Sequence, residues 1–156
     1  MKARFLYLIA FAVIALDQAS KFAVIYRLPF GSSVPVLGGI VHFTTVENPG
    51  GAFGLFQSWA GMLTLITIAV CAAILVFVRR KVSLPVVVGT ALALQLGGAV
   101  GNLIDRIRFH YVIDFIDLRV WPVFNVADSA ITIGIVLLAY YLIFLDRRRV
   151  SAELKG

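Results

Sequence analysis

The sequence predicts an all-α membrane protein with four transmembrane helices and a small extracytoplasmic β-sheet. Three observations lead to this fold class. The 156-residue chain is 61% hydrophobic and 14% charged, whereas charged residues make up about a quarter of a typical soluble protein. Four apolar segments are each close to the length that crosses a bilayer. Two stretches between them are rich in β-branched and aromatic residues. At this length we expect a single integral membrane domain, residues 1–156.

The four apolar segments define the expected helices. The expected spans are about residues 5–25, 59–78, 82–106 and 124–145. A helix needs about 20 residues to cross the hydrocarbon core. The fourth segment reaches that length only if its polar start, with Asn125 and Asp128, lies near the interface. The first segment begins like a signal peptide, but Asp17 to Lys21 does not resemble a small-residue cleavage site, so we expect a retained helix.

The basic residues predict the orientation of the four spans. Nine of the 14 Lys and Arg residues flank helix ends that share one side: Lys2, Arg4, Arg79, Arg80, Lys81, Arg147, Arg148, Arg149 and Lys155. Basic residues concentrate on the cytoplasmic side of membrane proteins. Both termini should therefore be cytoplasmic, with residues 26–58 and 107–123 on the outer face. The net charge of +6 is then a topology signal, and we expect no nucleic-acid partner.

The two outer stretches carry the expected sheet. The run from Ile40 to Val46 is β-branched and aromatic and is bounded by glycines and by Asn48-Pro49, which is typical of a strand. Residues 109–120 have a similar composition and could pair with it. Trp59 and Trp121, the only tryptophans, fall at outer helix boundaries, where aromatic belts lie.

Polar residues at the outer helix ends are the candidates for function. Ionisable groups at membrane depth are energetically costly and are functional candidates by default. Three pairs are spaced to share a helix face: Asn102 with Asp105, Asn125 with Asp128, and Asp17 with Lys21.

Some of these pairs also have a purely structural interpretation. Asp17 and Lys21 could be an i,i+4 ion pair that stabilises a helix end. Asn125 could be an N-cap, with Asp128 in the first turn, where a carboxylate suits the helix dipole. From the residues alone, both interpretations stay open beside the functional one.

Three other residues have similar alternatives. Asp105 could form a local interfacial pair with its neighbour Arg106, and Gly50 could be a turn residue. Asp114 and Asp117 are three apart and would face opposite sides of a strand, so we do not expect both in one site.

The side chains available restrict the chemistry. A lone cysteine, Cys71, excludes an intramolecular disulfide and a cysteine metal cage, and His42 and His110 are too few for a histidine-rich metal site. Hydrolysis could instead use two carboxylates that share a proton, because like charges held close together cannot both ionise. The sequence offers five candidates and does not choose two: Asp17, Asp105, Asp114, Asp117 and Asp128.

Five ordered motifs carry a family resemblance over nearly the whole chain. They are Asp17-Gln-Ala-Ser-Lys21, Asn48-Pro-Gly50-Gly-Ala-Phe53, Gly101-Asn102-Leu-Ile-Asp105-Arg106, Val112-Ile-Asp114-Phe115 and Phe124-Asn125-Val-Ala-Asp128-Ser129. In these motifs the chain resembles the lipoprotein signal peptidases (signal peptidase II) of bacteria. The resemblance implies a four-helix bundle that carries a small β-cradle on the outer side.

The resemblance also implies roles for residues. Asp114 and Asp128 match the catalytic aspartates of an aspartic endopeptidase. Five residues would bind or position the substrate: Asn48, Gly50, Asn102, Arg106 and Asn125. Three would support the site: Asp105 as a brace, and Asp17 with Lys21 from the first helix.

The implied reaction removes signal peptides from diacylglyceryl-modified prolipoproteins, before the lipidated cysteine, with no metal or cofactor. The expected partners are that substrate and membrane lipid. The enzyme would act as a monomer in the bacterial cytoplasmic (inner) membrane, with its active site at the outer face.

Three other functions remain alternatives. A transporter or channel subunit would carry its acids near the bilayer midplane, whereas here they gather at the outer ends. A presenilin-like protease would carry a Gly-x-Gly-Asp signature, which is absent. A non-catalytic scaffold would use the outer sheet to bind a partner.

Overall fold

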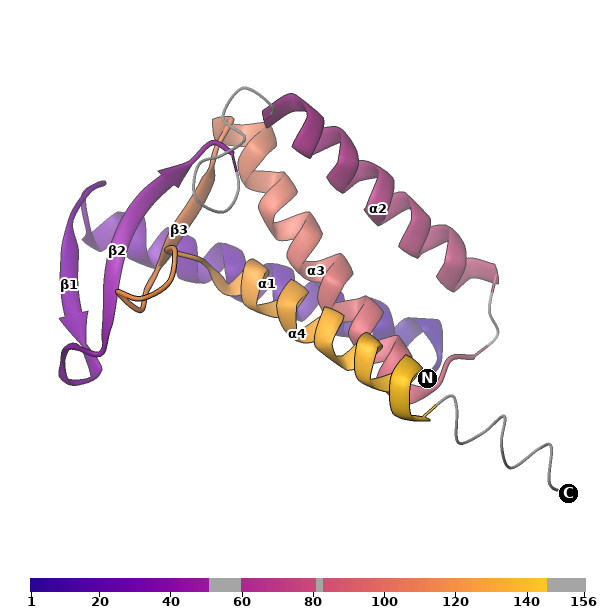
Figure 1. The fold of residues 1–156 in the computed structure, drawn as a ribbon. Coiled ribbons are helices and arrows are strands. Elements are labelled where there is room, and N and C mark those ends of the chain that lie inside the picture. The colour runs from indigo at the N-terminus through magenta and orange to yellow at the C-terminus, as the bar shows by residue number, and fades with distance from the viewer. Residues whose placement is uncertain (51–59, 81–82, 146–156) are drawn as a thin grey trace, which may run out of the picture.

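The structure, a computed structural model, describes residues 1–50, 60–80 and 83–145. In these residues the chain forms a helical bundle with a three-stranded sheet at one end (Figure 1). The helices are α1 (Ala3–Arg27), α2 (Ala60–Arg80), α3 (Val86–Phe109) and α4 (Val126–Tyr140), which continues as the π-helical turn η4 (Tyr141–Leu145). The strands are β1 (Ser33–Val36), β2 (Val41–Asn48) and β3 (Val112–Asp117), and the 3-10 turn η1 (Leu37–Gly39) joins β1 to β2.

All four helices in the described ranges are long and apolar enough to span a bilayer, with mean hydropathies from 1.6 to 2.7 over their most apolar windows. Large apolar side chains point outward, among them Phe11 (70% exposed) and Leu65 (68% exposed). Water would disfavour so much exposed apolar surface, whereas lipid covers it. The protein is therefore a multi-pass membrane protein, and the expected fold class is confirmed.

Helix α3 lies at the centre of the bundle. Most of its apolar window is buried within the protein, whereas most of each other helix's window is not. It begins after Pro85, four residues later than the expected span, because proline suits a helix start but lacks an N–H. It ends at Phe109, where His110 takes a left-handed conformation and its N–H donates to Arg106 O.

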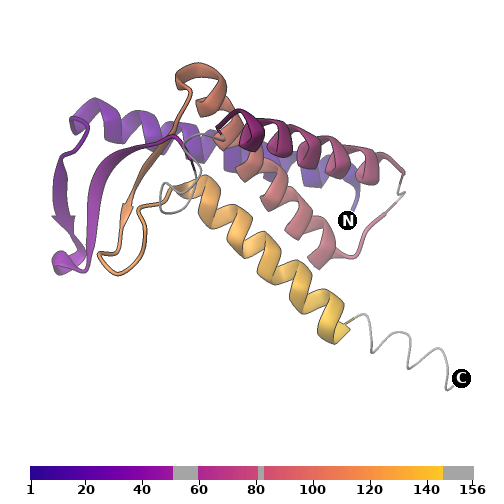
Figure 2. The ribbon, with the colours of Figure 1, turned by 45° about the horizontal axis from the view of Figure 1, so that its top comes forward.

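The sheet lies against the C-terminal ends of α1 and α3 and the start of α4 (Figures 1 and 2). Its order is β1-β2-β3, with both pairs antiparallel. The expected strand at 40–46 corresponds to β2, and the expected pairing with residues 109–120 corresponds to β3. The pairing of β2 with β3 shifts register between Phe43 and Val46. Strand β1 was not expected.

Glycines let the helices approach α3 closely. A Cβ at Gly97 would lie 2.7 Å from the carbonyl oxygen of Ala10 in α1, and a Cβ at Gly98 would overlap the carbonyl oxygen of Ala127 in α4. Since these neighbours are backbone atoms, they cannot rotate away. The two glycines therefore set how near α1 and α4 lie to α3.

Gly98→Ala should separate α3 from α4 and destabilise the fold by about 1–3 kcal/mol, the usual cost of overpacking. Thermal unfolding in detergent measures the effect. Gly61→Ala is the matched control, since a Cβ there meets nothing within 4 Å and alanine favours a helix. A Gly98→Ala protein that melts with the wild type would contradict the close-approach argument.

Candidate active site

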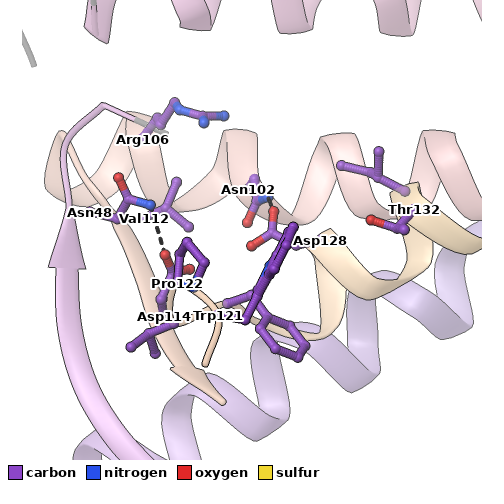
Figure 3. A pocket seen from close by; sticks show the side chains of 12 residues that line it. Asn48, Asn102, Arg106, Val112, Asp114, Trp121, Pro122, Asp128 and Thr132 are labelled. Carbon is purple, nitrogen blue, oxygen red and sulfur yellow. Dashed lines mark hydrogen bonds between the residues drawn. The ribbon is translucent and has the colours of Figure 1, made fainter. Parts of the chain in front are cut away.

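Asp114 and Asp128 come from different elements and line one cavity of about 280 Å³. Asp114 lies in the middle of β3, and Asp128 is the third residue of α4. Figure 3 shows their carboxylates on neighbouring sides of this active-site cavity, with the Trp121 ring beside Asp128. The other lining residues are Asn48, Asn102, Arg106, Val112, Pro122, Val123, Phe124, Ile131 and Thr132.

Two amide side chains hold the Asp114 carboxylate. Asn125 Nδ2 donates to Oδ1 at 2.7 Å, and Asn48 Nδ2 donates to Oδ2 at 2.8 Å. Asn48 is itself fixed, because its Oδ1 accepts from the Gly50 N–H at 3.1 Å. Gly50 thus forms a local turn and also orients Asn48. Gly51 to Phe53 of the same motif lie outside the described residues.

Asp128 is held by a capping box at the start of α4. Its N–H donates to Asn125 Oδ1 at 2.8 Å, and its Oδ2 accepts from the Asn125 N–H at 3.3 Å. The remaining oxygen, Oδ1, accepts from Asn102 Nδ2 at 2.8 Å. The capping interpretation is therefore confirmed, and the same contacts place the Asp128 carboxylate at the cavity.

Asn125 connects the two aspartates. It is fully buried, and its side-chain nitrogen donates to Asp114, to Asn102 Oδ1 at 3.1 Å and to the Ile113 carbonyl at 3.3 Å. Its side-chain oxygen caps α4 through Asp128. One amide thus orients carboxylates from a strand and a helix.

A buried ion cluster lies beneath these amides. Lys21 Nζ lies 2.9 Å from Asp17 Oδ2 and 2.7 Å from Asp105 Oδ2, and it donates to Asn102 Oδ1 at 3.0 Å. The i,i+4 pair of Asp17 and Lys21 is confirmed. Asp105 forms its ion pair with Lys21 rather than with the adjacent Arg106, contrary to the local pair that the sequence allowed. Arg106 instead lines the active-site cavity.

The two acids of the cluster also anchor backbone next to the site. Asp17 Oδ1 accepts from the Ala127 N–H at 2.9 Å, and Asp105 Oδ2 accepts from the Ile113 N–H at 3.1 Å. Ala127 precedes Asp128, and Ile113 precedes Asp114. The cluster therefore fixes the backbone of both cavity aspartates from α1 and α3.

Sequence reasoning missed Gln18 as part of this cluster. Its Nε2 lies within hydrogen-bond distance of Asp17 Oδ2 (3.1 Å), Asp105 Oδ1 (3.0 Å) and the Gly101 carbonyl (3.2 Å). Its position beside Asp17 in an otherwise apolar segment was the available signal.

Asp117 lies apart from this site, as its spacing from Asp114 predicted. Its carboxylate accepts from Thr44 Oγ1 and from the Arg119 N–H, each at 2.8 Å. These contacts hold the start of the connection that brings Trp121 to the cavity. Trp59, the other expected boundary residue, lies outside the described residues.

The Asp114 carboxyl is a weaker acid than usual, mainly because its side chain is buried, with 2% of it exposed. Burial and the nearby Asp128 charge raise the pKa of Asp114 to about 7, although hydrogen bonds from Asn48 and Asn125 oppose the shift. A carboxyl with this pKa can both hold and release a proton near neutral pH. No group of three or more His, Cys, Asp or Glu side chains in the described parts of the chain is placed to hold a metal ion.

Comparisons with known proteins match this chain over most of its length. A family model described as signal peptidase (SPase) II matches residues 9–144. A lipoprotein signal peptidase of Moorella thermoacetica is 45% identical over 87% of this chain and 91% of the relative. Another, of Halothermothrix orenii, is 42% identical over 87% of this chain and 93% of the relative.

Solved structures agree in fold. A bacterial membrane enzyme determined by the in meso method at 2.3 Å resolution superimposes with a TM-score of 0.83 at 31% identity, over 89% of this chain and 87% of that one. A second such structure, at 1.9 Å, gives a TM-score of 0.81 at 31% identity over 90% and 93%.

Proposed function

The chain belongs to the signal peptidase II family, and we propose that it cleaves signal peptides from diacylglyceryl-modified prolipoproteins, just before the lipidated cysteine. The observation that carries the proposal is that Asp114 and Asp128 line one cavity and are joined through Asn125. Two carboxylates in this relation can act as acid and base, since their proximity favours a state with one shared proton.

In the proposed reaction, the ionised carboxylate takes a proton from water as the water oxygen attacks the scissile carbonyl carbon. The protonated carboxyl stabilises the developing oxyanion, and the C–N bond then breaks as a carboxyl proton passes to the leaving amine. The products are a new carboxylate on the signal peptide and a free amine on the lipidated cysteine. Burial and the neighbouring Asp128 charge raise the pKa of Asp114 to about 7, so the pair can hold one proton near neutral pH.

The cavity walls supply groups that can hold the substrate. Arg106 lines the cavity, and its guanidinium is the group there that could bind the scissile carbonyl oxygen and the developing oxyanion. Asn48 and Asn102 donate to the two aspartates and so fix the angle from which water is activated.

We also propose that the enzyme acts as a monomer in the bacterial inner membrane, with both termini cytoplasmic and the sheet outside. The start of α1 and the end of α2, which carry Lys2, Arg4, Arg79 and Arg80, lie opposite the sheet (Figure 1), and this supports the orientation. It places the active-site cavity at the outer face, where the lipid chains of a substrate can remain in the bilayer.

The test is cleavage of two purified prolipoproteins that differ only in the diacylglyceryl group. We expect turnover of the lipidated form and none of the unlipidated form. Cleavage of neither substrate would overturn the proposal and favour a transporter or a scaffold. Equal cleavage of both would show that the enzyme does not recognise the lipid of its substrate.

The rate should fall as pH rises through about 7. Asp114 has a pKa raised to about 7, so above that pH the pair loses its last proton and with it the acid; the rate then drops about tenfold per pH unit. Measuring kcat from pH 5 to 9 locates this fall, which is the alkaline limb of the pH–rate profile.

Asn48→Ala should move the limb to higher pH, because Asn48 stabilises the charged form of Asp114. Asp117→Asn is the control: it alters the same strand but lies apart from the cavity, so the limb should stay in place. A limb that Asn48→Ala does not move would show that another group controls it.

A further inference from the structure

A second cavity extends from the active site into the bundle, between α2, α3 and α4. This deep cavity has a volume of about 300 Å³ and shares Asn102, Arg106, Asp128 and Ile131 with the active-site cavity. Its remaining lining residues are Ile66, Thr67, Val70, Gln95, Ala99 and Ile135. It is thus an apolar chamber that opens on Asp128 and runs toward the middle of the membrane span.

Gln95 is a polar side chain that lines this chamber away from the two aspartates. Its Nε2 is buried and has no hydrogen-bond partner among the described residues. A buried, unpaired donor costs about 1–3 kcal/mol and calls for an explanation. Thr67, the chamber's other mid-span polar residue, donates to the Leu63 carbonyl of its own helix at 2.7 Å. Within the described residues Gln95 therefore keeps an unused donor, which a rotation of its side-chain amide would turn toward an occupant of the chamber.

An occupant of the chamber that satisfies Gln95 must carry an acceptor at a defined depth. Gln95 precedes Asn102 by seven residues on α3, which is about 10 Å along the helix, and Asn102 hydrogen-bonds Asp128. An extended peptide covers about 3.3 Å per residue. The acceptor is therefore about three to four residues from the reacting bond.

A third cavity lies on another side of Asp128. Together with the deep cavity, it provides two paths along which parts of a substrate could extend from the active site. This side cavity, of about 380 Å³, is lined by Leu118, Trp121, Phe124, Asp128, Ser129, Thr132 and Ile133. The substrate of the proposed function is branched at the reacting bond, with a signal peptide on one side and a lipidated cysteine on the other. Two apolar cavities that meet at Asp128 match two apolar branches.

Resting on the proposed function, we propose that the deep cavity receives the signal peptide and that Gln95 donates a hydrogen bond to one of its backbone carbonyls. A helix leaves its last four carbonyls unpaired, and lipid offers them no donor. The signal peptide must leave its helix before the scissile bond, because a peptide is cleaved in extended form. Amide carbonyls accept hydrogen bonds more strongly than the ester carbonyls of the lipid, and several of them are unpaired where the signal peptide's helix ends. The orphan donor therefore favours the peptide, which leaves the side cavity to the lipid.

The first test compares Gln95→Leu with the wild type on a lipidated prolipoprotein. Loss of one membrane hydrogen bond should raise KM about tenfold with kcat unchanged. The matched control is Thr90→Val, which removes a polar group from the same helix outside the three cavities. It should leave KM unchanged. An unaltered KM in Gln95→Leu overturns the proposal.

Truncated substrates identify the branch that Gln95 contacts. A lipidated peptide that begins two residues before the scissile bond lacks the carbonyl at issue, so Gln95→Leu and wild type should cleave it with equal KM. Shortened acyl chains on a full signal peptide should preserve the tenfold difference. The opposite pattern, a difference that depends on the acyl chains, would assign the deep cavity to lipid and overturn the proposal.

A binding readout separates this inference from the proposed chemistry. Gln95→Cys in a Cys71→Ala background should cross-link to a signal peptide with a cysteine four residues before the scissile bond, and not to one eleven residues before it. Absence of the first cross-link overturns the deep-cavity assignment even if cleavage is normal. Failure of the wild type to cleave any lipidated substrate would instead overturn the proposed function.

Discussion

Asp114→Asn and Asp128→Asn should each lower kcat for lipidated prolipoprotein by at least about a thousandfold, because each removes half of an acid–base pair. The measurement is single-turnover cleavage by purified protein. Asp117→Asn is the matched control, as it neutralises a strand carboxylate that contacts Thr44 and Arg119 instead of the cavity. It should retain activity.

The two variants should differ in stability. Both oxygens of Asp114 accept from side-chain amides, those of Asn48 and Asn125. An asparagine at this position would place its own NH₂ group next to one of these donors, so that one hydrogen bond is lost. Asp128→Asn can keep its oxygen toward Asn102 and lose only the 3.3 Å contact with the Asn125 N–H. We expect the lower melting temperature for Asp114→Asn. Turnover above a tenth of wild type in either folded variant would remove that residue from the mechanism.

Lys21→Met should be among the most destabilising single substitutions in this protein. It leaves the carboxylates of Asp17 and Asp105 buried without their shared cation, and breaking a buried ion pair from one side costs about 3–5 kcal/mol. Thermal unfolding in detergent measures this loss. Arg119→Met is the comparison, since the half-exposed Arg119 lies 3.6 Å from Asp117 and ion pairs with a solvated member contribute about 0–1 kcal/mol.

A compensated variant tests the cause of the Lys21→Met effect. Adding Asp17→Asn and Asp105→Asn removes both stranded charges, while their side-chain oxygens can still accept from the Ala127 and Ile113 N–H groups. Stability should then recover in large part. A Lys21→Met protein whose free energy of unfolding lies within about 1 kcal/mol of the wild-type value would show that the ion cluster does not anchor the fold.

The helices and most of the sheet were predictable because their signals are local. Apolar runs of bilayer length have few alternatives to a transmembrane helix, and the β-branched run before Asn48 became β2. Strand β1 was missed because it is four residues long, contains Pro35 and is mostly exposed. It is a strand because β2 pairs with it, with Pro35 opposite His42, and the sequence alone carries no signal of that pairing.

The candidate site was predictable as a set of residues and not as an arrangement. Spacing placed Asn125 with Asp128 on one helix, but it could not show that the same amide reaches Asp114 on β3. Long-range contacts of this kind depend on how near α3, α4 and the sheet lie. That distance is controlled in part by Gly98, whose role is invisible without the packing.

The anchoring of the first turn of α4 has a consequence for local opening. Helix ends ordinarily fray, and their amides exchange with solvent at little free-energy cost. Here the Ala127 amide is bound by Asp17 from another helix, and the Asp128 amide is bound by Asn125, which also holds β3. This turn cannot unwind alone, so Asp128 leaves its position only when the ion cluster beneath it also opens.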